Sequence, residues 1–132
     1  MDDLFMKLRL FLKSPSRNQY IQDDHMKIYL RKSVRRINNQ FYAFIDFANI
    51  EITDSSKRGK GLFTLFLSTF LSRYPDINIF VECIHNPHLT YKLKQFGFVE
   101  ARTSIHDLHM FLLNSKNIVT PSDVYSLNKY FH

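Results

Sequence analysis

The sequence predicts an α/β (α+β) fold, in which a central mixed β-sheet is flanked by helices. Three observations support this prediction. Apolar and polar residues alternate with a period of two over 26–35, and a longer apolar strand is expected over 41–52. A basic loop with two glycines follows, and then a helical apolar stripe over 62–71. The next apolar strand, 77–84, lies at a distance that suits a βαβ crossover.

The N-terminal region is predicted to be helical. A strand would also fit its apolar positions, but a single helical face accounts for them and is the preferred interpretation. Pro15 ends this helix, and a short second helix is expected over 17–22. The residues on the expected buried face are Leu4, Phe5, Leu8, Phe11 and Leu12.

The strand over 26–35 carries one basic face. Arg31 and Arg35 could meet an acidic substrate there, although a solvated sheet face is the simpler interpretation. Asn38 and Asn39 predict a turn, because asparagine tolerates positive φ. The strand over 41–52 is apolar on both faces, so we expect it to be central.

The second half of the chain predicts one more helix and two more strands. Asn86 is a suitable N-cap with Pro87 after it, and Gly97 is placed to end the helix in left-handed geometry. Strands are expected over 98–101 and 106–113, and the tail from 114 is a short helix or a loose cover. One domain is therefore expected over 1–132, with a helical N-terminal segment (1–25), a core (26–113) and a C-terminal cover (114–132).

Composition sets further limits on function. The 132 residues are enough for one core, and the formal charge of +6 favours an anionic ligand or partner. The single cysteine, Cys83, excludes an internal disulfide and is expected to be inert core. There is no basic leader at the N-terminus and no apolar run of the roughly 20 residues that cross a bilayer, so a cytoplasmic protein without membrane contact is expected.

The loop from Lys57 to Gly61 has the composition of a phosphate site. Its two glycines allow tight backbone geometry, and the following helix turns its unpaired amides and positive dipole end to the same place. Lys57, Arg58 and Lys60 add positive charge. The spacing matches neither the P-loop nor the dinucleotide fingerprint.

The stretch from Ser56 to Gly61 resembles the Arg/Gln-x-x-Gly-x-Gly/Ala motif of the GNAT acyltransferase superfamily. The resemblance continues with Asn86, with the Gly97-Phe98 pair and with a methionine-bearing strand over 109–113. The chain is also similar to small acetyltransferase-like proteins that bacteriophages encode. Ser56 departs from the motif, because the family has Arg or Gln there.

The resemblance implies a GNAT-like fold, whose mixed sheet splays open beside the glycine loop, and acetyl-CoA as the acyl donor. It implies transfer of an acetyl group to an amine, and it leaves open whether the acceptor is a small molecule or a protein, whether an acidic macromolecule is a partner and whether the chain forms a homodimer. The residues that it places at the donor are Ile50, Ile52, Lys57, Arg58, Gly59, Lys60, Gly61, Leu62, Phe63 and Asn86.

The same resemblance suggests Glu51 as the catalytic base, with Glu82 as the second choice. Alternatively, Glu51 merely pairs with Lys57 or Arg58 at a strand end. Many family members have a tyrosine seven residues after the asparagine to protonate the leaving thiolate, and Leu93 stands at that position here.

The departure at Leu93 leaves three alternatives. Another acid such as Tyr42 or Tyr74 could act, the thiolate could leave without an acid, or the chain could lack catalysis. In the last case it is a GNAT-shaped binding protein that acts on a host protein or nucleic acid through its basic surface.

Other candidate sites carry less weight. Histidines at 85, 88, 106 and 109 lack a supporting cysteine or carboxylate cluster, so we expect no metal. Ser104, His106 and Asp107 are too close in sequence to be credited as a triad. Basic residues at 32, 35 and 36, with tyrosines at 29 and 42, could hold nucleic acid, but no recognition motif accompanies them.

Overall fold

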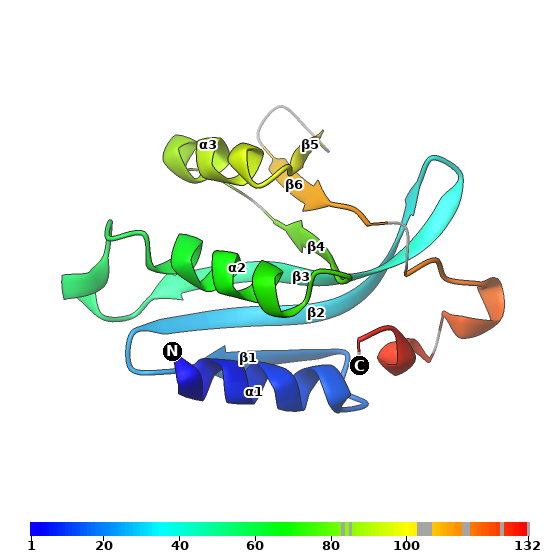
Figure 1. Cartoon of the computed structure of the whole chain (residues 1–132), viewed down its shortest axis with the longest axis horizontal. Coiled ribbons are helices and arrows are strands. Elements are labelled where there is room, and N and C mark those ends of the chain that lie inside the picture. The colour runs from blue at the N-terminus through cyan, green and yellow to red at the C-terminus, as the bar shows by residue number, and fades with distance from the viewer. Residues whose placement is uncertain (83, 85, 103–106, 115–116, 125, 132) are drawn as a thin grey trace.

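The computed structural model describes residues 1–82, 84, 86–102, 107–114, 117–124 and 126–131. It has three α-helices and six strands in these parts of the chain (Figure 1), which confirms the predicted fold class. In chain order the elements are α1 (Asp2–Lys13), β1 (Asn18–Gln22), β2 (Met26–Ile37), β3 (Gln40–Ile52), the 3-10 helix η1 (Ser55–Lys57), α2 (Leu62–Arg73), β4 (Asn78–Val81), α3 (Pro87–Gln95), β5 (Val99–Arg102), β6 (Leu108–Leu112), and the 3-10 helices η2 (Pro121–Asp123) and η3 (Leu127–Tyr130).

The strands form one mixed sheet in the order β1-β2-β3-β4-β6-β5. The pair β3–β4 is parallel, as the crossover through α2 requires, and the other neighbours are antiparallel. Strand β3 lies inside the sheet, as its apolar sequence predicted. Asn38 and Asn39 have φ of 51° and 68°, and this two-residue turn with positive φ fixes the register of the β2–β3 hairpin.

All three helices pack on one face of the sheet, which we call the covered face (Figure 1). The predicted face of α1 is confirmed, because all five of its expected core residues are buried. Helix α1 meets α2 through Phe5 and Phe66, whose ring centroids are 4.9 Å apart. Asn86 caps α3 and Gly97 follows it with φ of 96°, as predicted, and Leu93 of α3 is fully buried. None of the described helices is long and apolar enough to span a membrane.

The opposite face, which we call the open face, carries a second and smaller cluster. Its buried members are Tyr42, Phe44 and Phe80, and no described helix contributes to it. The C-terminal tail contains the two short 3-10 helices η2 and η3, and it is not a loose cover. It is bound to β3 by backbone hydrogen bonds from Ala43 N to Asn117 O (2.9 Å) and from Val119 N to Phe41 O (2.7 Å), and its Val119, Leu127 and Phe131 are buried in the main core.

Two predicted elements are corrected. Residues 18–22 are not helical but form the edge strand β1, which pairs along its whole length with β2. Only Ile21 of this strand is buried, so the sequence has no alternation that would reveal it. The strand predicted over 77–84 is shorter, because β4 ends at Val81. Cys83, predicted to be inert core, lies outside the described residues.

Candidate functional site

Strands β3 and β4 separate halfway along β3. Their parallel pairing ends at Phe47 and Val81, and the last contact runs from Glu82 N to Phe47 O (3.1 Å). Beyond that point β3 contains an extra residue, since Tyr29 lies opposite Asn49 while Leu30 lies opposite Phe47. Such a β-bulge bends a strand and increases its twist. The sheet therefore opens at this place.

A pocket of about 390 Å³ occupies this opening, and we call it the strand gap. Its volume lies in the range of ligand-binding pockets. The strand gap brings together three of the predicted site residues, namely Ile50, Glu82 and Asn86. Asn86 accepts a hydrogen bond from His88 N (2.9 Å) and so also caps α3. The complete lining is Ala48, Asn49, Ile50, Val81, Glu82, Ile84, Asn86 and Leu89.

The glycine loop leads directly to the N-terminus of α2. The first backbone hydrogen bond of this helix runs from Leu65 N to Gly61 O (3.0 Å), and no side chain caps the helix. The amides of residues 62–64 therefore have no partner within the helix, and the dipole adds positive potential. Gly59 and Gly61 have φ of 71° and 73°, a backbone conformation that favours glycine. The ring of Phe63 lies 5.8 Å from that of Phe47, so α2 begins beside the strand gap.

The three loop cations, Lys57, Arg58 and Lys60, are exposed. Arg58 Nε donates to Ile52 O (3.1 Å), which holds this guanidinium against the end of β3. The Arg58 amide donates to Ser55 O (3.4 Å), so it is part of the turn and is not one of the unpaired amides at the start of α2.

Ser56, the departure from the family motif, stabilises the loop locally. Its backbone N (3.1 Å) and its hydroxyl (2.7 Å) both donate to Asp54 Oδ1. Asp54 also contacts His25 Nδ1 (3.0 Å). These hydrogen bonds, from Ser56 first and then His25, lower the pKa of Asp54.

The two predicted carboxylates lie in different surroundings. Glu51 is exposed on β3 and lies opposite Lys27. Arg58, which was considered as an ion-pair partner of Glu51, donates to the Ile52 carbonyl. Glu82 is half-buried, lines the strand gap and is held by two arginines of β2. The structure thus brings Glu82, and not Glu51, to the pocket.

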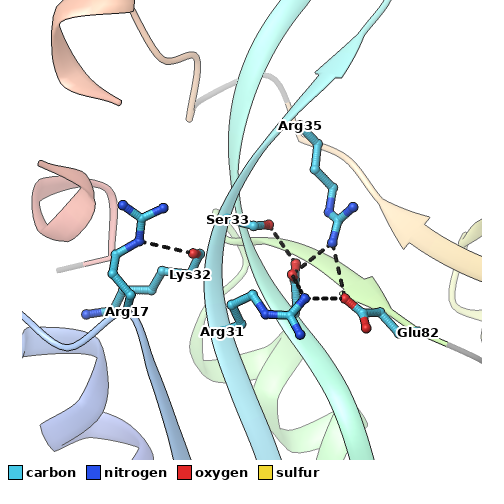
Figure 2. A network of polar contacts seen from close by, with 7 residues as sticks. Arg17, Arg31, Lys32, Ser33, Arg35 and Glu82 are labelled. Carbon is cyan, nitrogen blue, oxygen red and sulfur yellow. Dashed lines mark hydrogen bonds and ion pairs between the residues drawn. The ribbon is translucent and has the colours of Figure 1, made fainter. Parts of the chain in front are cut away.

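Glu82 belongs to a group of four charged residues, Arg31, Arg35, Asp46 and Glu82, which we call the open-face ion cluster. Figure 2 shows Arg31 and Arg35 reaching Glu82 from the same side of β2. Glu82 Oε1 lies 2.6 Å from Arg31 Nη1 and 3.3 Å from Arg35 Nη2. Asp46 Oδ2 lies 2.8 Å from Arg35 Nη2 and 3.4 Å from Arg31 Nη1.

Asp46 is fully buried, and the sequence analysis missed it. Burial raises the pKa of its carboxyl, while Arg35 and a hydrogen bond from Ser33 Oγ (2.7 Å) act in the opposite direction. The sequence did contain a signal for this contact, because counting residues back along both strands from the Asn38–Asn39 turn places Arg31 opposite Asp46. The sequence analysis considered an acidic substrate or solvent as the surroundings of Arg31 and Arg35. Neither interpretation was complete, since both arginines are partly buried against carboxylates of the chain itself.

Lys32 does not share a surface with Arg35, which corrects the grouping considered for nucleic acid. It points to the covered face (Figure 2) and is 1% exposed. Its Nζ donates to Ser14 O (2.6 Å) and Asn128 Oδ1 (3.3 Å). Burial, with a smaller contribution from Arg17, lowers the pKa of Lys32 to about 8.

The tyrosines considered as acids are distant from the strand gap. Tyr74 follows the C-terminal end of α2, roughly 18 Å from its first turn. Tyr42 precedes Ala48 by about 20 Å along β3. Tyr29 is closer by register, because it lies opposite Asn49, which lines the gap.

The remaining predicted residues do not form a site in the described part of the chain. His85, Ser104 and His106 lie outside the described residues. Among the residues that are described, no group of three or more His, Cys, Asp or Glu side chains could hold a metal ion.

Comparison with known proteins supports the fold. No model of a protein family matches the chain, and no curated protein matches it. A solved structure from Corynebacterium glutamicum, described as histone acetyltransferase HPA2 and related acetyltransferase, is similar with a TM-score of 0.51 and 14% identity, over 90% of this chain and 75% of the other. The chain therefore has the fold of the GNAT acetyltransferases.

Two likenesses with lower TM-scores are to a toxin in complex with part of its antitoxin and to a protein–DNA complex. A mutant of the AtaT toxin, bound to the C-terminus of the antitoxin AtaR and acetyl-CoA, gives a TM-score of 0.46 at 18% identity over 67% of this chain. A KacTA–DNA complex gives 0.47 at 17% identity over 70%. The chain spans 57% and 63% of the length of these two proteins.

Proposed function

We propose that the protein is an acetyl-CoA-dependent N-acyltransferase, which moves an acetyl group directly to an amine. One observation carries the proposal: a helix N-terminus without a side-chain cap, three exposed cations and a pocket between parting strands lie next to one another. Helix N-termini bind phosphate, and the gap suits the narrow arm of the donor.

The residues present fit the donor. The amides of 59–63 and the charges of Lys57, Arg58 and Lys60 would hold its pyrophosphate. Beyond Phe47, the edge of β3 that faces β4 is no longer paired with it, so Ile50 and Ile52 lie where backbone groups can align the pantetheine arm. Asn86 would contact the arm from the opposite wall of the gap.

Acetyl-CoA supplies a thioester, whose carbonyl carbon is attacked by the amine nitrogen. The new C–N bond replaces the C–S bond, the sulfur leaves as a thiolate and the amine gives up a proton. We assign the acceptance of that proton to Glu82, because its carboxylate lines the gap, while Glu51 on β3 is exposed and does not line it. Arg31 and Arg35 both contact Oε1, so Oε2 is the oxygen available to the amine or to an intervening water.

A second candidate function is a GNAT-shaped binding protein with little or no transferase activity. Buried Leu93 favours it, because the position of the usual acid is filled by core. Its partner would be a host protein or nucleic acid with an acidic surface. Under this alternative acetyl-CoA binding can persist, but acetyl transfer does not accompany it.

Thermal unfolding with acetyl-CoA, with CoA and without ligand tests the proposal. Saturation at 100 times the dissociation constant should add about 2.7 kcal/mol of stability. Gly61→Asp should abolish the shift because it places a negative charge at the pyrophosphate. Gly61→Asn is the control for this variant, since asparagine has the same shape as aspartate, carries no charge and also tolerates positive φ. If neither ligand stabilises the wild type at millimolar concentration, the proposal is wrong.

A further inference from the structure

The turn between β1 and β2 contacts the start of the glycine loop. The ladder between β2 and β3 ends at the pair Met26–Ile52. Just beyond it, His25 O accepts two backbone hydrogen bonds, from Thr53 N (2.9 Å) and from Asp54 N (3.3 Å). As the chain leaves β3, it is therefore bound to a turn that lies 29 residues earlier in the sequence.

This β1–β2 turn is held by hydrogen bonds of its own. Asp23 Oδ1 accepts from His25 N (2.8 Å) and from Met26 N (2.9 Å), and Asp23 N donates to Met26 O (3.0 Å). Directly before and after the turn, β1 and β2 pair at Gln22 and Lys27. The turn is therefore a fixed part of the sheet against which the loop is placed.

Side chains make a second connection between the turn and the loop. Asp54 Oδ2 lies 3.0 Å from His25 Nδ1, while Oδ1 accepts from Ser56 N (3.1 Å) and from the Ser56 hydroxyl (2.7 Å). We call His25, Asp54 and Ser56 the loop anchor. Lys57 N also donates to Asp54 O (2.9 Å). The anchor thus fixes residues 53–57, which directly precede the two glycines.

The glycines themselves are held by little else. Both Gly59 and Gly61 have positive φ, and a Cβ at either position would meet no atom within 4 Å beyond the adjacent residues. Glycine occupies several backbone regions with similar ease. The directions of the loop amides therefore depend on how the two ends of the loop are held. One end is the first turn of α2, and the other is the loop anchor.

Neither stability nor charge accounts for the anchor. The side chains of His25 and Asp54 are 42% and 30% exposed, and ion pairs between exposed groups contribute little to stability. A carboxylate next to a phosphate site also repels the anion. What the carboxylate of Asp54 provides is two oxygens that connect the turn to the loop.

We propose that His25 and Asp54 are positioning residues for the donor, which hold the glycine loop in the conformation that binds the pyrophosphate of acetyl-CoA. This inference rests on the proposed function, because it takes the glycine loop as the pyrophosphate site. It also gives a role to Ser56, the departure from the family motif, whose amide and hydroxyl connect the carboxylate to the loop.

Calorimetric titration with CoA tests the anchor without requiring acetyl transfer. Asp54→Ala removes all three side-chain hydrogen bonds, so we expect the Kd for CoA to rise about tenfold or more. Asp54→Asn keeps an oxygen that can accept from Ser56 and removes the negative charge. The Kd of this variant should therefore equal that of the wild type or be lower.

His25→Ala tests the other half of the anchor. It should raise the Kd for CoA less than Asp54→Ala does, because it removes one of the three hydrogen bonds. Since His25 acts through Asp54, the double variant should bind CoA no more weakly than Asp54→Ala alone.

Asp123→Ala is the matched control. Asp123 also accepts from a hydroxyl, Thr120 Oγ1 (2.8 Å), and pairs with a cation, Lys129 Nζ (2.9 Å). It belongs to η2, which lies at the opposite end of the sheet from the glycine loop (Figure 1). This variant loses a comparable group and should leave the Kd for CoA unchanged.

The outcomes separate the inference from the proposed function. If Asp54→Ala and Asp54→Asn bind CoA equally, whether tightly or weakly, the carboxylate does not act by positioning and the inference is wrong. If Asp54→Ala does not fold, His25→Ala against His25→Asn carries the same test, because asparagine can replace Nδ1, and equal Kd values would again contradict it. If the wild type does not bind CoA, the proposed function is wrong and the inference is lost with it.

Discussion

The two faces of the sheet differ in how they accommodate charged side chains, and β2 shows the difference within five residues, 31–35. Lys32 points to the covered face, where it lies 4.6 Å from the Phe11 ring centroid in an otherwise apolar core. Arg31 and Arg35 point to the open face, where two carboxylates neutralise them (Figure 2). The covered face therefore provides most of the stability, and the open face holds polar groups in fixed positions next to the strand gap.

Removal of a large side chain from the covered face is expected to have the largest effect. Phe66 is fully buried between α1 and β3, so Phe66→Ala should lower the free energy of unfolding by about 3–5 kcal/mol. Leu65→Ala on the same helix is the control, because Leu65 is 57% exposed and should cost little. Urea denaturation of both variants measures the difference, and equal losses would contradict the assignment of the core to this face.

An isosteric change that removes one negative charge from the open face should affect activity more than folding. Glu82→Gln keeps the shape of the side chain but removes the proton acceptor, so kcat should fall by about 100-fold or more. Glu51→Gln should have the smaller effect, because Glu51 is exposed and does not line the gap. Steady-state kinetics of the two variants decides between the carboxylates, and a larger loss for Glu51→Gln would reverse the assignment.

Lys32 gives the covered face a pH dependence. Its pKa is lowered to about 8 in the folded state, so burial of the charged amine destabilises the protein below pH 8, and this cost disappears as the pH rises towards 10.5. Relative to Lys32→Met, the free energy of unfolding of the wild type should increase by about 2–3 kcal/mol between pH 7 and pH 10. Denaturation of both proteins at the two pH values measures the change. A difference that does not vary with pH would contradict the burial of this amine.

Asp46 gives the open face a pH dependence at lower pH. Its pKa is raised in the folded state, so the stability that it contributes is fully present below about pH 4 and is lost as the pH rises through the folded pKa. Wild type should therefore be more stable relative to Asp46→Asn at pH 4 than at pH 7. Urea denaturation of both proteins at the two pH values measures the sign of this change in stability. The opposite sign would mean that the arginines lower the pKa of Asp46 more than burial raises it.

Strong periodicity made most elements predictable from the sequence. The alternation in β2 and the apolar stripes of α1 and α2 reflect burial on one face, and this pattern is local. Strand β1 was predicted as a helix because only Ile21 is buried, and its strand geometry comes from pairing with β2 rather than from its own residues.

The site was less predictable, because its parts come from distant segments. The glycine loop and Asn86 have local signatures. Asp46 does not, since it lies in an apolar run and its partners are across a hairpin. The approach of Glu82 to Arg31 depends on the parallel register of β3 and β4, which only the crossover through α2 determines.

The most direct test of the central claim is a map of backbone amide chemical shifts in the ¹⁵N-labelled 15.8 kDa protein as acetyl-CoA is added. The account predicts that the perturbed amides belong to the glycine loop and first turn of α2 (59–63) and to the strand gap (48–50 and 81–82). Perturbations confined to other parts of the chain, or none at saturating acetyl-CoA, would contradict the placement of the donor between β3 and β4.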